Sequence, residues 1–318
     1  MIPGAVVAVI TSFRPDEGLL VTVDALQGQV TEIVVVDDGS GSGSDDTLER
    51  IGERGARVIR LLENSGIAAA LNVGIRTALE RGADFVVTFD QDSQPNHQFV
   101  LALVEAHTRA AADGHAVGPV VPEYFAGVRQ VHRTEEDGTL IARHAIQSGM
   151  LLSRELLSRI GLMREDLFID LVDTEFEMRC AASGRFTIAA PGLHMGHTLG
   201  SQYARTFFGR AFRAPGIPPV VTLSTPFRYY YRVRNRLVIN RVYWRSHLGW
   251  IARDTALEAV HFCNALMLAR PRRRLWSLYA AAIADARHDR MGRMPAPLQA
   301  AATAISWAAP PVAWSPRG

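Results

Sequence analysis

The chain has 318 residues, of which 48% are hydrophobic and 21% charged, and its formal net charge is +2. These values are ordinary for a folded globular protein and exclude a chain that is disordered over most of its length. No run of about 20 residues is apolar without interruption, and no basic region precedes the first apolar run. We therefore expect neither a membrane-spanning helix nor a secretory signal.

Short apolar runs alternate with a helical pattern through the first half of the chain. Residues 5–10, 33–36 and 85–89 predict buried strands, and the alanine-rich segment 67–79 predicts a helix that ends near Gly82. This alternation favours an α/β fold in which helices cover both faces of a mostly parallel sheet. In such a sheet the functional side chains follow the carboxyl ends of strands.

The second half begins with further helical patterns and then changes in composition. Residues 153–160 and 173–183 predict helices, whereas residues 122–143 lack periodicity and are expected to form a loop. Beyond about residue 200, arginine and aromatic residues dominate. We therefore predict an α/β domain over residues 1–215 and a helical extension over residues 216–318.

Charge is divided unevenly along the chain. Residues 1–180 hold 15 arginines against 28 acidic residues, and residues 181–318 hold 19 against 4, with no lysine in either part. An anionic membrane surface is a partner that suits arginine and aromatic residues, and segments 227–234 and 270–274 are the candidates. The alternative is a solvated face above an aromatic core. We expect no nucleic-acid partner, because no known binding module accompanies the arginines.

The two cysteines are far apart and show no spacing typical of a metal site. We expect Cys180 and Cys263 to be two buried thiols in a protein of a reducing compartment.

Paired carboxylates follow two of the predicted strands. Asp37 and Asp38 end one strand, and Asp90 and Asp92 follow another at the same expected edge of the sheet. Two like charges 4 Å apart repel by about 4 kcal/mol at an effective dielectric constant near 20, so such a group needs a cation, protons or hydrogen-bond donors. The pattern favours a Mg²⁺ or Mn²⁺ site. For any one of these residues, a turn or helix cap is the alternative.

Several short motifs resemble the family 2 glycosyltransferases of the GT-A fold. In chain order they are Thr11-Ser12-Phe13, Val36-Asp37-Asp38-Gly39-Ser40, Asn64-Ser65-Gly66, Asn72-x-Gly74 and Asp90-Gln91-Asp92-Ser93. Residues 148–149, 167–175 and 197–200 are similar to the rhamnosyltransferase branch of that family. The resemblance covers roughly residues 5–240.

This resemblance implies a site for a nucleotide-diphosphate sugar with a divalent ion. The matching donor positions are Thr11, Phe13, Asp38, Asn64, Gly66, Asn72 and Asp90. Phe13 corresponds to the aromatic residue that stacks on the nucleobase, and Asp38 to the carboxylate that bonds it. Asp90, Asp92 and His197 correspond to the metal site, for which His194 is a competing histidine. The basic residue that the family often carries near residues 67–71 has no counterpart here.

The resemblance also implies a catalytic base and an acceptor region. Asp173 matches the base, and the acceptor candidates are Ser148, Gly149, Asp170 and Glu175. For Asp170 and Glu175, helix capping is an equal alternative. A carboxylate that removes the proton of an acceptor hydroxyl, with a metal that stabilises the leaving diphosphate, gives a single displacement that inverts the anomeric carbon.

We therefore predict an inverting, metal-dependent glycosyltransferase. The preferred donor is dTDP-L-rhamnose, and the acceptor is a glycan or polyprenyl-linked glycan of bacterial cell-envelope polysaccharide synthesis. The alternatives are a UDP-sugar transferase, such as a galactofuranosyltransferase, and a non-catalytic sugar-nucleotide-binding scaffold. The expected location is the cytoplasm, peripheral to the inner face of the cell membrane.

Overall fold

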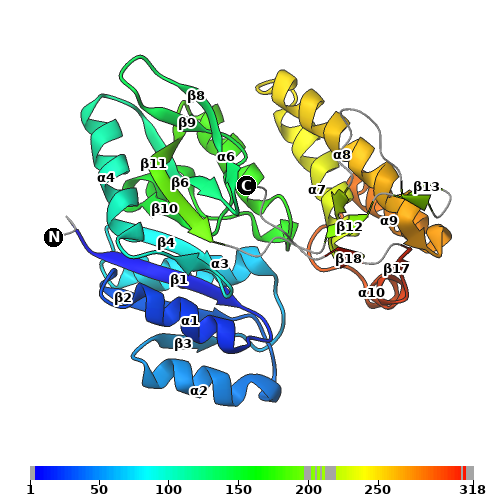
Figure 1. Cartoon of the computed structure of the whole chain (residues 1–318), viewed down its shortest axis with the longest axis horizontal. Helices are drawn as coiled ribbons and strands as arrows, with labels where there is room; N and C mark the ends of the chain where they lie inside the picture. The colour runs from blue at the N-terminus through cyan, green and yellow to red at the C-terminus, as the bar shows by residue number, and fades with distance from the viewer. Residues whose placement is uncertain are drawn as a thin grey trace. The chain divides into compact units, whose positions relative to one another are not determined.

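The computed structural model describes residues 4–196, 202–204, 206–207, 210–211, 220–308 and 311–312. The chain forms two compact units: Met1–Phe168 with Val172–Thr198, and Ile169–Leu171 with Leu199–Gly318 (Figure 1). The division falls earlier than the boundary predicted at residue 215. The reason is that strand β12 (Gln202–Ala204) pairs with β15 (Val220–Thr222), which places it in the second unit.

The first unit is built on one mixed sheet. Within the described residues its strand order is β3-β2-β1-β4-β10-β6-β11-β9-β8, with β5 paired to β11 and β7 paired to β6. The strands are β1 (Val6–Ser12), β2 (Glu32–Asp37), β3 (Arg57–Arg60), β4 (Phe85–Asp90), β5 (Gln94–Pro95), β6 (Val117–Phe125), β7 (Val128–Arg129), β8 (Val131–Thr134), β9 (Leu140–Ala142), β10 (Met150–Ser153) and β11 (Phe186–Gly196).

The N-terminal part of this sheet is parallel, as predicted. β1 lies between β2 and β4 and runs parallel to both, and β2 runs parallel to β3. Every residue of β1 is buried, which is expected of a strand in a parallel sheet covered on both faces. β10 inserts antiparallel between β4 and β6, so the sheet as a whole is mixed.

Helices connect and cover these strands. They are α1 (Glu17–Leu26), α2 (Asp45–Glu53), α3 (Ile67–Glu80), α4 (Phe99–Ala112), α5 (Arg154–Ile160) and α6 (Val172–Ala182), with short 3₁₀ turns η1 (Ser42–Ser44) and η2 (Glu165–Leu167). α3 confirms the predicted helix and packs on β1 and β2. Gly74 permits this close approach, because a Cβ there would lie 2.3 Å from Cγ1 of Val9.

The prediction of a loop over residues 122–143 is wrong. The segment holds the end of β6 and the strands β7, β8 and β9. β7 and β8 are two and four residues long, and their side chains are mostly exposed. Such short strands pair through their backbones without a buried face, so they leave no apolar alternation in the sequence.

The second unit is largely helical, as predicted, and also contains small sheets. Its helices are α7 (Arg228–Tyr243), α8 (Leu248–Leu268), α9 (Arg272–Arg287) and α10 (Ala296–Thr303). The described strands form three small groups: β12 with β15 and β18 (Pro311–Val312), β13 (Thr206–Phe207) with β14 (Arg210–Ala211), and β16 (Ala269–Arg270) with β17 (Ser306–Trp307).

Aromatic residues of α7 form the core of this unit. Tyr229, Tyr230 and Tyr231 are almost fully buried, and the guanidinium of buried Arg234 lies 5.4 Å and 5.1 Å from the ring centroids of Tyr230 and Tyr231. Most of segment 227–234 is therefore core and not a membrane-binding surface. None of the described helices combines the length and the apolar character needed to cross a bilayer.

Candidate active site

The ends of three neighbouring strands bring the predicted donor residues to one edge of the sheet. In the strand register, Thr11 of β1 is level with Asp90 of β4, and Ser12 is level with Asp37 of β2. Phe13 follows directly after the last residue of β1. The sequence-based placement of the carboxylate pairs at a common edge is therefore found in the fold.

The first carboxylate pair organises two loops. Oδ2 of Asp37 accepts the amide of Ser40 at 3.0 Å. The two oxygens of Asp38 accept the backbone amides of Ser65 at 2.7 Å and Gly66 at 2.9 Å. Asp38 thus ties the segment after β3 to the end of β2.

Gly66 precedes the first residue of α3 and has a backbone conformation that disfavours other residues. Its φ is +95°, and a Cβ at this position would lie 2.5 Å from the carbonyl oxygen of Phe168. The backbone at the start of α3 therefore approaches the segment before α6 closely, which explains a glycine at this point of the Asn64-Ser65-Gly66 motif.

Phe13 presents its ring at this edge of the sheet. The side chain is exposed, and the guanidinium of Arg14 lies 5.1 Å from its ring centroid. The backbone amide of Phe13 donates to Oε1 of Gln91 at 2.8 Å, which fixes the loop. An exposed aromatic ring on a fixed backbone is suited to stack on a planar ligand.

Asp90 is the last residue of β4 and Asp92 follows the strand. Gln147, which was not predicted from the sequence, binds Asp90. Nε2 of Gln147 donates to Oδ1 of Asp90, whereas Asp92 is exposed. The hydroxyl of Ser148 is fully buried and lies 2.6 Å from that of Ser93. Ser148, predicted to contact the acceptor, therefore bonds within the protein, and the preceding glutamine reaches the carboxylate.

Three buried polar atoms near these strand ends have no hydrogen-bond partner among the described residues. They are Oγ of Ser12, Oδ1 of Asn64 and Oε1 of Gln147. More than nine-tenths of buried polar groups in folded proteins are paired. Ser12 ends β1, Asn64 lies shortly before α3, and Gln147 lies shortly before β10. A polar ligand bound at the ends of the strands would supply hydrogen-bond partners for these three atoms.

The chemistry of the two carboxylates fits a divalent ion held jointly with a ligand. Asp90 and Asp92 offer hard oxygen atoms, which Mg²⁺ and Mn²⁺ prefer. Among the described residues, no group of three or more His, Cys, Asp or Glu side chains is placed to hold a metal alone. Mg²⁺ is often bound by one or two carboxylates together with substrate phosphates. His197 lies outside the described residues, and His194 stacks on the ring of Tyr124 with centroids 4.4 Å apart.

Asp173 occupies the first turn of α6, and a second carboxylate lies one turn later. Oδ1 of Asp173 accepts the amide of Thr174 at 2.7 Å. Glu177, which the sequence analysis did not single out, is buried and accepts the amides of His144 at 3.0 Å and Ala145 at 3.2 Å. Burial raises the pKa of Glu177 to about 8, and the negative charge of Asp173 adds to this rise.

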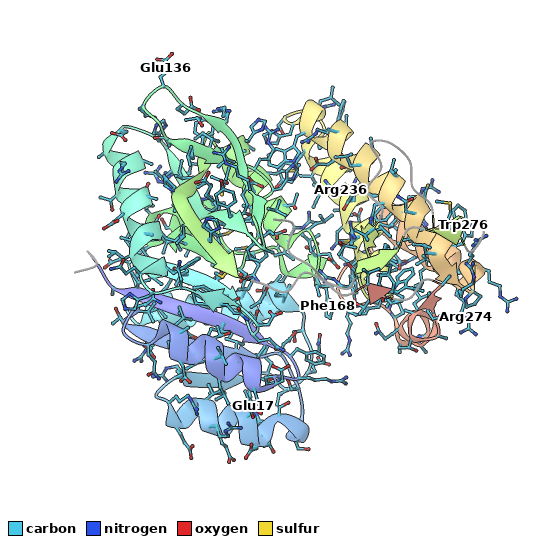
Figure 2. All side chains as sticks on the ribbon, viewed as in Figure 1. Glu17, Glu136, Phe168, Arg236, Arg274 and Trp276 are labelled. Atoms are coloured by element: carbon cyan, nitrogen blue, oxygen red, sulfur yellow. The ribbon has the colours of Figure 1, made fainter. Side chains whose placement is uncertain are left out.

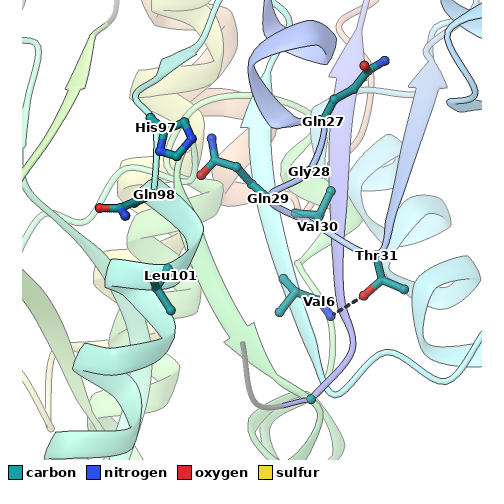
Figure 3. A pocket seen from close by; sticks show the side chains of 10 residues that line it. Val6, Gln27, Gly28, Gln29, Val30, Thr31, His97, Gln98 and Leu101 are labelled. Carbon is teal, nitrogen blue, oxygen red and sulfur yellow. Dashed lines mark hydrogen bonds between the residues drawn. The ribbon is translucent and has the colours of Figure 1, made fainter. Parts of the chain in front are cut away.

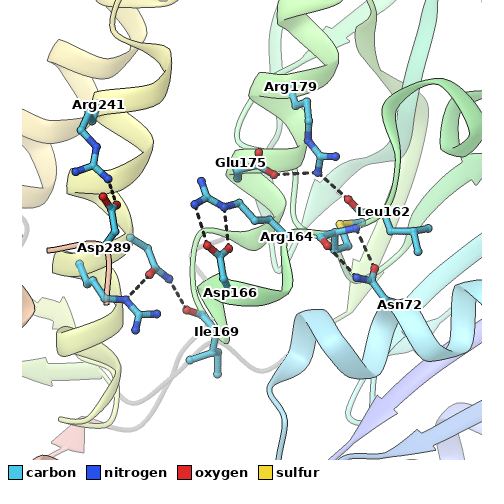
Figure 4. Close-up of polar contacts among 12 residues, drawn as sticks. Asn72, Leu162, Arg164, Asp166, Ile169, Glu175, Arg179, Arg241 and Asp289 are labelled. Carbon is cyan, nitrogen blue, oxygen red and sulfur yellow. Dashed lines mark hydrogen bonds and ion pairs between the residues drawn. The ribbon is translucent and has the colours of Figure 1, made fainter. Parts of the chain in front are cut away.

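The remaining predicted residues are engaged within the protein. Glu175 is buried and pairs with Arg179 at 3.0 Å, and Arg179 also donates to the carbonyl of Leu162 (Figure 4). A second bond runs from Arg179 to the carbonyl of Ile160. The amide of Asn72 bonds both the N–H and the carbonyl of Met163. Asn72 therefore shapes the segment before α6, and its described bonds do not reach the strand ends.

Two further predicted acceptor residues have defined surroundings. Gly149 has a φ of +78°, and a Cβ there would lie 2.7 Å from Cε of Met195, so the backbone needs this glycine. Asp170 belongs to the second unit, where Arg228 pairs with its carboxylate at 2.6 Å.

A cavity of about 470 Å³ lies elsewhere on the first unit. Its walls come from the start of β1, residues 27–31 before β2, and the start of α4 (Figure 3). Val6, at the amino end of β1, bonds Thr31 in this wall, whereas the carboxylate pairs follow the carboxyl ends of the strands. The cavity has no acidic residue in its wall. It is therefore separate from the candidate active site.

The two cysteines differ in solvent exposure. Cys180 is buried, and burial raises the pKa of its thiol to about 12. Cys263 is exposed on α8, so the expectation of two buried thiols is wrong for this residue. Residue 263 lies on the side of α8 that faces away from the core, which explains the exposure of this thiol.

Comparison with known proteins gives consistent matches. The model of "Glycosyl transferase family 2" matches residues 7–175. The dTDP-rhamnosyl transferase RfbF of Shigella flexneri is 30% identical over 270 residues, which cover 80% of this chain and 86% of that protein. An uncharacterized protein of Methanocaldococcus jannaschii is 40% identical over 73 residues, covering 23% of this chain and 29% of that protein.

A solved structure of GalNAc-T7 with UDP, GalNAc and Mn²⁺ matches with a TM-score of 0.55 at 15% identity. The match covers 76% of this chain and 48% of the other, so this chain spans about half the length of that protein. The sheet has the architecture of the GT-A fold. The chain belongs to glycosyltransferase family 2 and is similar over most of its length to a dTDP-rhamnosyl transferase.

Proposed function

We propose that this enzyme transfers L-rhamnose from dTDP-L-rhamnose to a hydroxyl group, with inversion at the anomeric carbon and with the aid of Mg²⁺ or Mn²⁺. The observation that carries the choice of donor is the similarity to RfbF, which extends over 80% of the chain and thus beyond the family 2 region at residues 7–175.

In this proposal the edge of the sheet binds the donor. The exposed ring of Phe13 stacks on the thymine, and the carboxylate of Asp38 accepts a hydrogen bond from the base. Asp90 and Asp92 are the residues that would hold a divalent ion, whose remaining ligands the donor would supply. The unpaired atoms of Ser12, Asn64 and Gln147 meet polar groups of the nucleotide and sugar.

Asp173 acts as the general base. The first turn of α6 places its carboxylate at the end of a helix, with Oδ1 fixed by the amide of Thr174. It removes the proton of the acceptor hydroxyl as that oxygen attacks the anomeric carbon from the side opposite the diphosphate. The bound ion supplies Lewis-acid stabilisation of the charge on the leaving diphosphate. One displacement without a covalent sugar–enzyme intermediate inverts the anomeric centre.

The proposed acceptor is a glycan or polyprenyl-linked glycan of the bacterial cell envelope, and the proposed location is the cytoplasmic face of the cell membrane. Gly149 and Glu175 of the first unit remain proposed acceptor residues, with Ser148 as a buried support. Asp170, which belongs to the second unit, is a separate acceptor candidate. A UDP-sugar donor such as UDP-galactofuranose is the second candidate, since the matched GalNAc-T7 structure contains UDP.

The test is release of nucleoside diphosphate by the purified protein from dTDP-L-rhamnose, UDP-galactofuranose and other UDP-sugars, with and without EDTA. We expect release from dTDP-L-rhamnose that EDTA abolishes and added Mg²⁺ or Mn²⁺ restores. Asp173→Asn should retain donor binding and lose transfer, whereas Asp113→Asn, at the exposed end of α4, should behave as wild type. Preference for a UDP-sugar would overturn the choice of donor, and donor binding without turnover would favour a scaffold.

A further inference from the structure

Helix α8 of the second unit is apolar on the side that faces away from its core. Trp250, Ile251 and Leu268 are buried and face the unit, yet Leu248 and Val260 are 63% and 62% exposed. Ala252, Ala256, Cys263 and Met267 are also exposed. A helix on the surface of a soluble unit normally carries polar and charged residues on its outer face.

The acidic residues of α8 lie away from this outer face. Its two acidic residues are turned toward α7 and the core: Glu258 accepts from Nε of Arg236 at 2.6 Å, and buried Asp254 accepts from Nε1 of Trp250 at 2.9 Å. The remaining charged residue, Arg253, is exposed. The outer face therefore carries apolar side chains and positive charge without any acidic residue.

A cluster of arginines lies at the C-terminal end of this face. Arg270 and Arg272 each donate to the carbonyl of Met267 at 3.1 Å, which places both beside the last turn of α8. Arg273 and Arg274 follow at the start of α9 and are exposed. Within the described part of the chain, none of these four forms an ion pair. In Figure 2, Arg274 and Trp276 point outward from the helices, and Trp276 is 61% exposed.

We propose that the outer face of α8 docks on an anionic phospholipid surface. The four arginines described above and Trp276 are part of this docking surface. Helices that lie in the plane of a membrane interface combine an apolar face with basic residues, and tryptophan is enriched at that interface. A second copy of this chain fits the surface less well. A two-fold contact through α8 would bring arginine against arginine with no acidic residue to pair with either.

This inference rests on the location at the membrane face that is part of the proposed function, and it names the surface involved. The test measures membrane binding alone, so its outcome is independent of the proposed transfer reaction. The docking surface also replaces segment 227–234, whose aromatic residues are buried, as the membrane-binding candidate. The surface that remains consists of α8 and the start of α9.

The test uses the full chain and vesicles of phosphatidylcholine with or without phosphatidylglycerol. Exposed Cys263 lies on the outer face of α8, whereas Cys180 is buried with a raised thiol pKa, so an environment-sensitive fluorophore attaches selectively at Cys263. At low salt we expect flotation with the anionic vesicles and a blue shift of the label. We expect neither with phosphatidylcholine alone, and high salt should weaken both.

Two variants separate the apolar and the charged contributions. Val260→Glu should abolish the blue shift, whereas the matched control Val21→Glu, on α1 and 58% exposed, should leave it unchanged. Replacing Arg272, Arg273 and Arg274 by glutamine should weaken binding about a hundredfold, from roughly fivefold for each arginine.

Three outcomes would overturn the proposal. The first is absence of binding to the anionic vesicles at low salt. The second is binding that the arginine variant weakens but Val260→Glu leaves intact, since this would be adsorption by charge without the helix face. The third is a dimer in sedimentation velocity that Val260→Glu dissociates, because the surface would then join two copies of the chain.

Discussion

Arg228, the first residue of α7, donates through Nη2 to Oδ1 of Asp170 at 2.6 Å. Two turns later, Nδ2 of Asn235 donates to the carbonyls of Ile169 and Asp170, each at 2.9 Å. The turn that these bonds hold is strained, because Phe168, Asp170 and Leu171 all have φ between +61° and +67°. Each such conformation in a residue other than glycine costs on the order of 1–3 kcal/mol. Asp173 follows two residues after this turn.

Loss of the Asn235 side chain should release this turn. Asn235→Ala leaves the carbonyls of Ile169 and Asp170 without their described donor, and we expect a loss of about 1–3 kcal/mol in the free energy of unfolding. If the turn orients Asp173, kcat for rhamnosyl transfer should fall about tenfold or more while the KM for the donor stays the same. Asn240→Ala, on the same helix, removes one bond to Thr255 and is the control. Equal kcat values in the two variants would show that the turn does not position Asp173 for transfer.

Glu177 should make the protein less stable as the pH rises. Its folded pKa of about 8 lies above the ordinary value of 4.5, so the folded state retains a proton that the unfolded state releases. The contribution of this group to stability is complete below about pH 4.5 and is lost as the pH rises through 8, at about 1.4 kcal/mol per pH unit. Glu177→Gln should therefore raise Tm by several degrees at about pH 9 and have little effect at about pH 4.5.

Glu155→Gln provides the matched control for this experiment. Hydrogen bonding to Arg185 lowers the pKa of Glu155, so this carboxylate stabilises the fold above its unfolded pKa and loses that contribution in acid. Its replacement should bring no gain in Tm at high pH. A gain of equal size in both variants would attribute the effect to general charge reduction.

Gln147 should contribute to donor affinity. Its Nε2 bonds Asp90 and its Oε1 is buried without a described partner, so a bound donor is expected to complete its hydrogen bonding. Gln147→Met should weaken dTDP-L-rhamnose binding about tenfold, measured by titration calorimetry. Gln130→Met is the contrasting variant, because Gln130 bonds the carbonyl of Pro122 and the amide of Ile146 within the protein. That change should lower stability and leave donor affinity unaltered; the reverse pattern would contradict the assignment.

Gly66 should tolerate no side chain. Gly66→Ala combines a φ of +95° with an approach of 2.5 Å to a backbone oxygen. Gly55→Ala has a φ of +83° but nothing within 4 Å, so it isolates the cost of the backbone conformation, which is about 1–2 kcal/mol. In urea unfolding, Gly66→Ala should cost clearly more than Gly55→Ala or fail to fold. Similar costs would mean that the segment near Phe168 moves aside.

The sequence predicts those features whose signal is local. The helix expected over 67–79 and the strands that end at Asp37 and Asp90 follow from apolar periodicity, and their order indicates the parallel sheet. The placement of Gln147 beside Asp90 depends on β10, which pairs antiparallel with β4 across more than 50 residues of chain. A pairing over that distance leaves no periodic pattern, so the contact could not be inferred.

Composition alone does not show whether arginine and aromatic residues lie on the surface or in the core. Arginine and tyrosine in segment 227–234 suggest a surface, yet Arg234 is buried between aromatic rings and donates to the carbonyl of Gly292 at 2.6 Å. The long apolar stem and planar head of arginine allow this packing. Conversely, α8 looks like an ordinary core helix until the exposure of its outer face is known.

Residues 169–171 limit where the chain can be cut into separate fragments. They group with the second unit although the chain returns to the first at Val172. A fragment that ends at residue 198 would therefore contain a strained turn without Arg228 and Asn235, its bonding partners. The two units are interleaved in sequence, so they cannot be exchanged between relatives as simple head and tail modules. A chimera has to take residues 169–171 from the same parent as α7.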